Sequence, residues 1–416
     1  MSSLQAYVDT LTGAARVASR GLRTLSAAAK NRALAAVAER IRAGSPAILA
    51  ANARDLERGR AAGLSAAMLD RLGLDERRIA GLLASIAEIS AFEDPVGEAT
   101  AVRRPAGFTL QKVRTPIGVV LFIYESRPNV TVDAAALCLK SGNAVILRGG
   151  SEALESNRAI AGAIREGLAA AGVPADAVQF VDRPEHEAID LLVAREGRID
   201  LVIPRGGEAL IRRVTERSRV PVIKHYRGVC HLYVDASADL GMAVKVVVNS
   251  KVQRPGVCNA LEKLLVHADV AAAFLPALRD AMPQVELRGC PRTLAILPGT
   301  KAATEADWSE EYLDLVLAVR VVDGRDEACS LIERYGSSHT DGILASDAAT
   351  IERFVSSVDS AAVVVNASTR LNDGGIFGLG AEIGISTDKL HARGPMGLRE
   401  LTTYKWVVRG SGDLRA

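Results

Sequence analysis

Cys258 offers the most reactive side chain in the sequence for covalent chemistry. It lies in the segment Lys251-Val-Gln-Arg-Pro-Gly-Val-Cys-Asn-Ala-Leu-Glu262, in which Pro255 and Gly256 predict a turn just before the thiol. Cations such as Lys251 and Arg254 favour the thiolate form of a nearby cysteine. A thiolate in a loop is able to form a thioester or thiohemiacetal, which divides one difficult step into two. The alternative is a buried, inert cysteine, the usual state of a free thiol, and this segment alone leaves both interpretations open.

Other polar residues are candidate partners for a nucleophile. Asn129 follows an apolar segment and Pro128, and its amide is able to stabilise an oxyanion; an ordinary turn asparagine is the alternative. His225, His231 and His339 are candidate general bases, because a Cys-His hydrolase needs a histidine within hydrogen-bond reach of the thiol. Structural histidines are the alternative, and sequence alone does not separate the two.

Two glycine-containing turns follow apolar segments and are candidate anion sites. Arg148-Gly-Gly-Ser151 and Pro204-Arg-Gly-Gly-Glu208 each precede a predicted helix. Backbone N–H groups at a helix N-terminus attract anions, and Arg148 adds a charge suited to phosphate. Neither turn has a GxGxxG or Walker pattern, so each alone is also explained as a strand-to-helix turn. Two such turns at one sheet edge favour a dinucleotide crevice.

The elements around these residues alternate between strand and helix. Residues 1–92 have helical apolar spacing, and residues 108–113 alternate like a half-exposed strand. Predicted strands at 118–123, 144–147, 178–181 and 201–203 each precede a predicted helix, at 131–141, 152–171, 185–195 and 208–217. A second series of strands is predicted at 231–234, 262–266, 294–297, 318–322 and 362–365. This alternation predicts an α/β fold with two doubly wound parallel sheets.

Composition excludes several classes of protein. The 416 residues exceed one compact core, and 51 basic against 49 acidic residues, with 4% aromatics, argue against nucleic-acid binding. The five widely spaced cysteines contain no CxxC pair, which favours reduced thiols in a cytoplasmic protein and predicts no metal site. Residues 1–9 lack the pattern of a secretory signal, and no apolar run is long enough to span a membrane.

Several long segments together resemble the aldehyde dehydrogenase superfamily. The order is Thr115-Pro-Ile-Gly118, Pro128-Asn129, the turn at Arg148, Gly206-Gly207, Gly228 and then Cys258. Within the superfamily the segments are most similar to the gamma-glutamyl phosphate reductase family, the glutamate-5-semialdehyde dehydrogenases of proline biosynthesis. The matching segments are residues 124–131, 249–262, 336–341, 366–375, 378–388 and 393–405.

The resemblance implies roles for individual residues. Cys258 matches the family nucleophile, and Asn129 with the Cys258 backbone N–H matches the oxyanion hole. Arg148 matches a ribose-binding lysine, Glu311 matches a glutamate that holds the nicotinamide ribose, and Gly206 and Gly207 match the cofactor turn. Substrate-binding candidates for the phosphate or α-carboxylate, for which arginine forks are suited, are Arg127, Arg254, His339, Ser368 and Arg370.

Three positions depart from the wider superfamily. His225 replaces the general-base glutamate of hydrolytic relatives, which implies that a thioester is protected from water. Ser151 replaces a glutamate of NAD-preferring relatives that would repel a 2′-phosphate, which favours NADPH as the cofactor. Ile211 replaces the second glycine of the cofactor turn.

These inferences combine into one expected enzyme. Residues 1–103 and 119–228 are expected to bind the dinucleotide, residues 229–388 to carry catalysis, and segments 104–118 and 389–416 to form a homo-oligomer. The expected reaction is NADPH-dependent reduction of L-glutamyl 5-phosphate to L-glutamate 5-semialdehyde, and glutamate 5-kinase is the expected partner that channels the substrate. The alternatives are a hydrolytic semialdehyde dehydrogenase, a Cys-His acyl hydrolase or transferase, and a non-catalytic scaffold.

Overall fold

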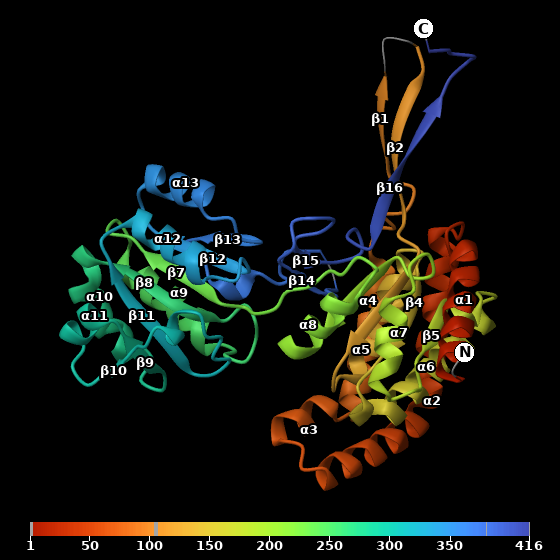
Figure 1. The fold of residues 1–416 in the computed structure, drawn as a ribbon, viewed down its shortest axis with the longest axis horizontal. Coiled ribbons are helices and arrows are strands. Elements are labelled where there is room, and N and C mark those ends of the chain that lie inside the picture. Colours follow the sequence, from red (N-terminus) through yellow and green to blue (C-terminus); the bar gives the residue numbers. More distant parts are fainter. Residues whose placement is uncertain (1–2, 104–106, 380, 416) are drawn as a thin grey trace. The chain divides into compact units, whose positions relative to one another are not determined.

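The chain divides into two compact units in the computed structural model, which describes residues 3–103, 107–379 and 381–415. Unit 1 contains Met1–Lys224, Leu379–Gly384 and Met396–Ala416, and unit 2 contains His225–Gly378 and Ile385–Pro395 (Figure 1). Two short paired strands, β14 (Gly384–Ser386) and β15 (Gly394–Met396), lie where the chain passes between the units. The division into dinucleotide-binding and catalytic segments stays a prediction.

Unit 1 is built on a four-stranded parallel sheet in the order β5-β4-β3-β6. Its strands are β3 (Val119–Tyr124), β4 (Ala144–Arg148), β5 (Val178–Phe180) and β6 (Leu201–Arg205). Every residue of β3 and β4 is buried, as expected for a parallel sheet covered on both faces. The strand order reverses between β3 and β6, and a crevice at such a reversal is the usual ligand site of open α/β sheets.

The described part of unit 1 also contains eight α-helices. They are α1 (Ser3–Leu22), α2 (Ala27–Ala61), α3 (Ala66–Leu72), α4 (Glu76–Ala91), α5 (Pro128–Lys140), α6 (Leu154–Ala170), α7 (His186–Val193) and α8 (Glu208–Arg217). The predicted N-terminal helical region is thus confirmed as four helices. Side-chain caps start three of them: Ser26 accepts from Ala29 N at 3.2 Å, Ser65 from Met68 N at 3.3 Å and Asp75 from Arg78 N at 2.6 Å.

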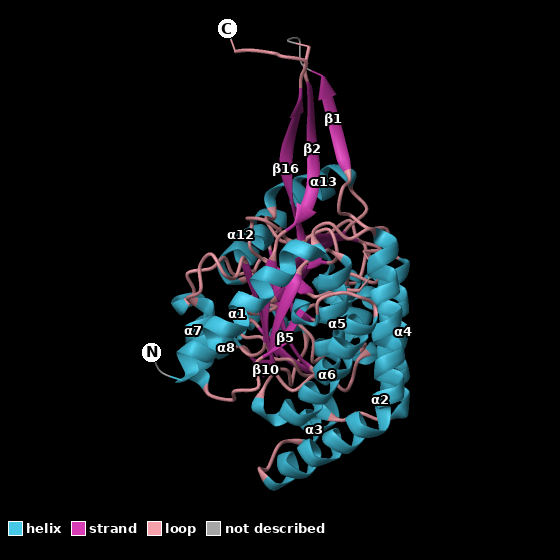
Figure 2. Ribbon diagram, turned by 90° about the vertical axis from the view of Figure 1, so that its right-hand side faces the viewer, coloured by secondary structure: helices cyan, strands magenta, loops and turns pink. Residues whose placement is uncertain are grey.

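A separate antiparallel ribbon extends from the helices of unit 1 (Figure 2). It pairs β2 (Thr109–Pro116) with both β1 (Ala99–Arg103) and β16 (Thr402–Arg409). Tyr404, Trp406 and Val408 on β16 are about half exposed or more. The ribbon includes residues 109–116 and 402–409 of the two segments expected to form an oligomer. Residues 104–106 lie outside the described residues, and the oligomeric role stays a prediction.

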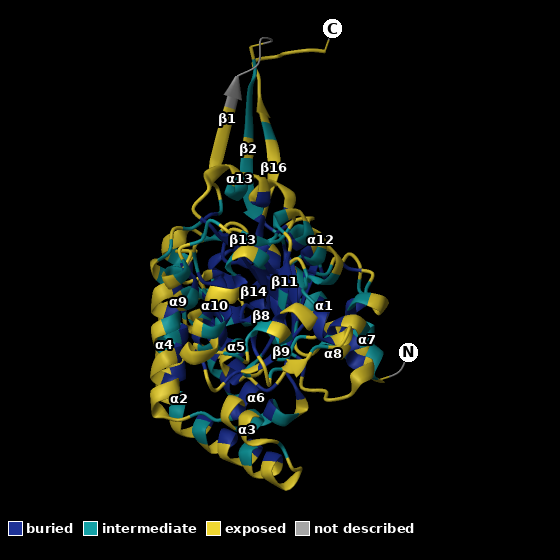
Figure 3. Cartoon of the chain, turned by 90° about the vertical axis from the view of Figure 1, so that its left-hand side faces the viewer, coloured by how far each residue is buried: buried dark blue, intermediate teal, exposed yellow. Residues whose placement is uncertain are grey.

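Unit 2 contains a seven-stranded parallel sheet in the order β10-β9-β11-β8-β7-β12-β13. Its strands are β7 (Cys230–Val234), β8 (Leu261–His267), β9 (Glu286–Gly289), β10 (Lys301–Ala302), β11 (Val316–Val322), β12 (Thr340–Leu344) and β13 (Ala362–Val365). Its α-helices are α9 (Leu240–Val252), α10 (Ala268–Ala281), α11 (Pro291–Ile296), α12 (Arg325–Tyr335) and α13 (Ala348–Ser357). The central strands form the buried core, coloured dark blue in Figure 3.

One predicted strand of unit 2 is wrong. Residues 294–297 end helix α11, which begins at Pro291, rather than forming a strand. A run of four apolar residues does not distinguish a strand from a buried helix end, and proline is favoured in a first helical turn. Strands β9, β10 and β12 were not predicted. Among the described residues, no helix is both long and apolar enough to cross a membrane.

The packing of α2 on α6 yields a test with a matched control. A Cβ at Gly167 of α6 would lie 2.5 Å from the Cα of Val37, whereas a Cβ at Gly162 of the same helix would meet no atom within 4 Å. We expect Gly167→Ala to lower the free energy of unfolding by about 1–3 kcal/mol because it forces the helices apart. Gly162→Ala should raise it by about 0.5–1 kcal/mol. Urea denaturation followed by circular dichroism measures both, and equal effects would contradict this packing.

Candidate active site

Cys258 lies in the loop between α9 and β8, where backbone packing fixes its position. A Cβ at Gly228 would lie 1.9 Å from the carbonyl oxygen of Cys258, so only glycine permits this approach. The Cys230 thiol donates to the same Cys258 carbonyl at 3.2 Å. Cys258 itself is half-buried, and the next residue, Asn259, is buried. The loop is therefore held by its backbone while the Cys258 side chain remains partly accessible.

Two histidines converge on the Cys258 thiol. The Cys258 Sγ and one imidazole nitrogen each from His225 and His339 lie within 4.8 Å of one another. The His225 Nδ1 bonds to the backbone carbonyl of Ile385 at 2.8 Å. A carbonyl only accepts, so Nδ1 carries the proton and Nε2 is the basic nitrogen of the neutral ring. His339 is buried, and its Nδ1 lies 2.8 Å from the Thr340 hydroxyl.

The third candidate base has a structural role. His231 is buried, and its ring Nδ1 lies 2.9 Å from the Asp341 carboxylate. The same Asp341 oxygen accepts the backbone N–H of His231. This arrangement ties the start of β7 to β12, which agrees with the structural alternative for this histidine.

Two arginines lie on the Cys258 side of unit 2. Arg370 donates to Gln253 Oε1 at 2.9 Å and to Asn259 Oδ1, and both acceptors belong to the Cys258 loop. Burial lowers the pKa of Arg370, and the neighbouring charge of Arg254 lowers it further. The Ser368 hydroxyl is buried and accepts from the Arg370 backbone N–H at 3.2 Å, so it caps the turn that carries this arginine. Two neighbouring cations, Arg254 and Arg370, thus lie beside the loop, where they suit an anionic substrate group.

A buried ion pair lies at the two ends of the Cys258 segment. Lys251 Nζ and Glu262 Oε1 are 3.3 Å apart, and both side chains are fully buried. Burial raises the pKa of Glu262, while the charges of Lys251 and Lys263 oppose this. Glu262 also accepts the backbone N–H of Tyr312 at 3.2 Å. Lys251 was expected to act as a cation near the thiol; the structure instead pairs its charge with Glu262.

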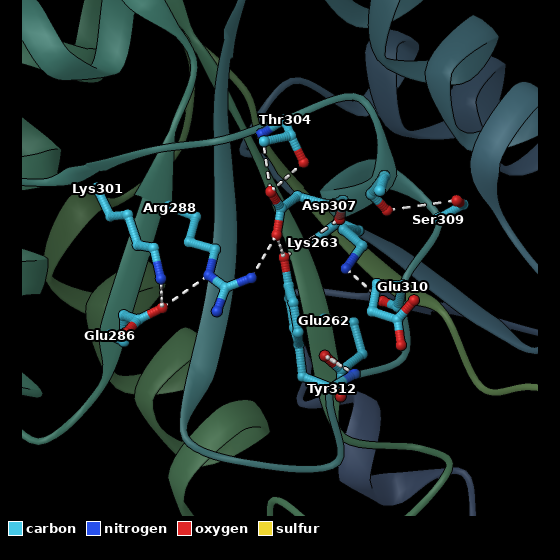
Figure 4. A network of polar contacts seen from close by, with 11 residues as sticks. Glu262, Lys263, Glu286, Arg288, Lys301, Thr304, Asp307, Ser309, Glu310 and Tyr312 are labelled. Carbon is cyan, nitrogen blue, oxygen red and sulfur yellow. Dashed lines mark hydrogen bonds and ion pairs between the residues drawn. The ribbon is translucent and has the colours of Figure 1, made fainter.

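The loop that carries Glu311 is anchored by a network of polar contacts (Figure 4). Asp307 accepts from Arg288 at 2.7 Å, from the Tyr312 hydroxyl at 2.7 Å and from the Thr304 backbone at 2.7 Å. Lys263 donates to the Glu310 carbonyl at 2.6 Å. These bonds fix the loop on both sides of Glu311.

Glu311 connects this loop to the nucleophile. Its carboxylate accepts the Gly228 backbone N–H at 2.9 Å. Gly228 is the residue that touches the Cys258 backbone. In unit 2, therefore, Glu311 helps to fix the segment against which the Cys258 loop packs.

The reversal between β3 and β6 in unit 1 forms a candidate anion site. The Glu125 carboxylate accepts the Gly207 backbone N–H at 3.0 Å, at the N-terminus of α8. A Cβ at Gly206 would lie 2.6 Å from the same carboxyl group. A carboxylate thus occupies the position in which a helix N-terminus would bind a phosphate. Ile211, the predicted departure from the cofactor turn, is buried further along α8, and binding of a dinucleotide at this edge stays a prediction.

A cavity of about 530 Å³ lies beside the turns that follow β3 and β4. Ser126, Ser151 and Glu152 line it from these turns, and Arg58 lines it from the end of α2. Arg58 is 56% exposed and pairs with the buried Asp55. The Ser126 N–H and hydroxyl both donate to Glu152, at 2.6 and 2.7 Å. The lining therefore combines the exposed cation of Arg58 with the carboxylates of Glu125 and Glu152.

Arg148 is held more tightly than its sequence position indicated. It is 6% exposed and donates to the carbonyls of Gly149 at 3.1 Å and Pro184 at 2.9 Å. Burial lowers its pKa. In this structure Arg148 thus braces the turn that precedes Ser151, with its Nε buried and lacking a hydrogen-bond acceptor.

The remaining predicted site residues lie at the start of α5. Arg127 precedes this helix, and Asn129 lies in its first turn, exposed. The Asn129 amide donates to the Asp133 carboxylate at 3.2 Å. Burial raises the pKa of Asp133, and hydrogen bonds from Ser85 and Asn129 oppose this. Asp133, which sequence reasoning missed, holds the Asn129 amide from one helical turn away.

Comparisons with known proteins identify relatives that cover nearly the whole chain. Residues 2–295 match the aldehyde dehydrogenase family. The gamma-glutamyl phosphate reductase of Geotalea daltonii is 56% identical over 404 residues, which cover 96% of this chain and 97% of that protein. The protein of the same name from Moorella thermoacetica is 53% identical over 411 residues, which cover 98% of each chain.

A solved structure is also similar over nearly the whole chain. The crystal structure of gamma-glutamyl phosphate reductase from Thermotoga maritima has a TM-score of 0.97 and 45% sequence identity to this chain. The match covers 98% of this chain and 100% of that one. The expected fold class, two doubly wound parallel sheets of the aldehyde dehydrogenase type, is confirmed.

Asp307 predicts how stability depends on pH. Burial tends to raise its pKa, but hydrogen bonds from Arg288, Thr304 and Tyr312 outweigh this and hold the pKa well below its usual range. A lowered carboxyl pKa stabilises the fold above the unfolded pKa of about 3.9, and this stability is lost as the pH falls toward the folded pKa. Asp307→Asn should therefore lower the free energy of unfolding by about 2–4 kcal/mol at neutral pH. Below a pH of about 5, the free energy of unfolding of Asp307→Asn should also fall less steeply with falling pH than that of the wild type.

Trp308 fluorescence in a Trp406→Phe background reports this unfolding from unit 2, because Trp308 is buried there. Asp323→Asn is the control, since Asp323 is 80% exposed and pairs with Arg292. It should change stability by at most about 1 kcal/mol. If the free energy of unfolding of Asp307→Asn fell as steeply in acid as that of the wild type, this role of the network would be contradicted.

Proposed function

Because this chain belongs to the aldehyde dehydrogenase family, and within it to the gamma-glutamyl phosphate reductases, we propose that it reduces L-glutamyl 5-phosphate. The product is L-glutamate 5-semialdehyde, phosphate is released, and NADPH is the reductant. The observation that carries the proposal is the setting of Cys258, a half-buried thiol beside two histidines and near Arg254 and Arg370.

The first half of the reaction transfers the acyl group to Cys258. The basic Nε2 of His225 takes the thiol proton, and the Cys258 thiolate attacks the acyl carbon. The C–S bond forms, the bond from carbon to the phosphate oxygen breaks, and phosphate leaves with its electron pair. Asn129 and the Cys258 backbone N–H stabilise the intermediate oxyanion. Asp133 keeps the Asn129 amide oriented for this role.

The second half releases the aldehyde. The family uses a nicotinamide cofactor, which when bound supplies a hydride to the thioester carbon. The C–S bond then breaks, and Cys258 leaves as a thiolate. Arg254 and Arg370 bind the phosphate or the α-carboxylate, Ser368 holds Arg370 in place, and Arg127 and His339 remain candidates for the same task.

His225 favours this reaction over hydrolysis of the thioester. A hydrolytic enzyme needs a base that activates water. The only base proposed beside Cys258 is His225, and once its Nε2 has taken the thiol proton it has no lone pair left with which to activate water. A hydrolytic semialdehyde dehydrogenase is the alternative, and its dependence on phosphate differs from that of the proposed enzyme.

The cofactor is proposed to bind along the carboxyl edge of the unit 1 sheet. At the α8 N-terminus the Glu125 carboxylate accepts the Gly207 N–H and lies against Gly206, so a cofactor phosphate would take the place of this carboxylate. Arg148 braces the neighbouring turn. Glu311 is proposed to hold the nicotinamide ribose, as well as the Gly228 backbone.

Preference for NADPH is proposed to depend on the cavity beside Ser151. Ser151 itself brings no negative charge, and Arg58 supplies an exposed cation. Glu125 and Glu152 also line the cavity, and the Glu152 carboxylate accepts hydrogen bonds from Ser126. Charge-assisted hydrogen bonds to phosphate are the stronger kind. The homo-oligomer, transfer of substrate from glutamate 5-kinase and the cytoplasmic location stay predictions.

Phosphate dependence tests the reaction. With glutamate 5-semialdehyde and NADP, we expect sustained formation of NADPH only when phosphate is present, because phosphate removes the acyl group. Cys258→Ala should abolish this activity, and Cys329→Ala, a half-buried thiol on α12, should keep it. Absorbance of NADPH measures both. Sustained turnover without phosphate would support the hydrolytic alternative, and turnover by Cys258→Ala would refute the nucleophile.

Cofactor preference tests the cavity. Arg58→Ala should raise the KM for NADPH by about 10- to 100-fold, the loss expected for a charged hydrogen bond, with little change in the KM for NADH. Ser151→Glu should shift preference toward NADH because its charge repels a 2′-phosphate. Initial rates with both cofactors decide this. Equal effects on NADPH and NADH would place the 2′-phosphate elsewhere.

A further inference from the structure

The group around Cys258 has the composition of a metal site, although the sequence contains no CxxC pair. Cys258 Sγ and one nitrogen each of His225 and His339 lie within 4.8 Å of one another, all in unit 2. These residues are far apart in the chain, so their spacing gave no indication of a ligand set. We propose that this group binds one Zn²⁺ reversibly, and that the metal withdraws the nucleophile from reaction.

The ligand chemistry favours zinc over other common divalent ions. Thiolate and imidazole ligands suit Zn²⁺, whereas Mg²⁺ and Ca²⁺ prefer oxygen. Three protein ligands leave the fourth tetrahedral position for water or a substrate oxygen. With Zn–S of about 2.3 Å and Zn–N of about 2.0–2.1 Å, tetrahedral ligands lie about 3.3–3.7 Å apart. The three atoms therefore need to approach by at most about 1.5 Å, within the range of small side-chain rotations.

Outer partners already orient both imidazole rings. The Ile385 carbonyl accepts from His225 Nδ1 at 2.8 Å, which leaves Nε2 as the metal-binding nitrogen. The Thr340 hydroxyl lies 2.8 Å from His339 Nδ1 and also accepts from Asn372 Nδ2 at 2.7 Å. Metal-bound histidines typically donate their other ring N–H to a carbonyl or similar acceptor, which fixes tautomer and orientation. Both rings have such an acceptor.

The surroundings predict reversible rather than structural binding. Arg254 and Arg370 place positive charge near Cys258, and this charge opposes a divalent cation. The backbone contacts of the Cys258 loop, through Gly228 and Cys230, involve no metal. The fold is thus complete without zinc, and zinc acts as an inhibitor or as protection of the thiol against oxidation.

Equilibrium binding to the full-length protein without substrates tests the site. Competition with a chromophoric zinc chelator should show one Zn²⁺ per chain. Cys258→Ser, His225→Asn and His339→Asn should each weaken this binding by more than about 100-fold, beyond the loss expected for an outer partner. Cys329→Ser is the matched control and should bind Zn²⁺ unchanged. Unchanged affinity in the three ligand variants, or no stoichiometric binding by the wild type, would overturn the proposal.

Cobalt provides a second readout that does not need the variants to fold. Co²⁺ added to the wild-type protein should produce a thiolate-to-Co²⁺ charge-transfer band, and prior alkylation of Cys258 should abolish it. A cobalt spectrum without this band would contradict ligation by Cys258. Binding does not depend on the proposed reaction, so failure of the metal site and failure of the enzymatic assignment are distinguishable. Where both hold, Zn²⁺ should inhibit NADPH formation, and a chelator should restore it.

Discussion

The missing side chain at Gly228 is the constraint on which the arrangement around Cys258 depends. Any Cβ there would collide with the Cys258 carbonyl, so the Cys258 loop and the start of β7 touch through bare backbone. Cys230 bonds to the same carbonyl, and Glu311 accepts the Gly228 N–H. Three segments far apart in the sequence are thereby fixed against one another, with the thiol close to a ring nitrogen of both His225 and His339.

A buried ion pair also maintains this arrangement. The Lys251–Glu262 pair connects the two ends of the Cys258 segment, and Glu262 accepts the Tyr312 backbone N–H. Breaking a buried pair leaves an uncompensated charge, which is costly. The Tyr312 hydroxyl donates to the Asp307 carboxylate, so both the backbone and the side chain of Tyr312 are held. The nucleophile and Glu311 are therefore positioned by one continuous set of contacts in unit 2.

The parallel sheets and the Cys258 segment could be predicted from the sequence, whereas the arrangement of side chains around the thiol could not. The parallel sheets follow from apolar segments that alternate with helices, and the segment around Cys258 resembles a known nucleophile. Sequence reasoning expected ligands at the carboxyl ends of strands, and the candidate anion site of unit 1 lies in the turns after β3 and β6, where its role stays a prediction. In unit 2, however, Gly228, Cys258 and His339 precede the strands β7, β8 and β12. The convergence of two histidines on the thiol depends on tertiary packing, and local spacing carries no information about it.

The central claim is that Cys258 carries the acyl group as a thioester that resists water. Peptide mass spectrometry after incubation with glutamate 5-semialdehyde and NADP, without phosphate, tests it most directly. The account predicts a glutamyl adduct on the Cys258 peptide, at up to one per chain, that disappears when phosphate is added. An adduct on a different residue, or none at all while NADPH continues to form, would contradict it.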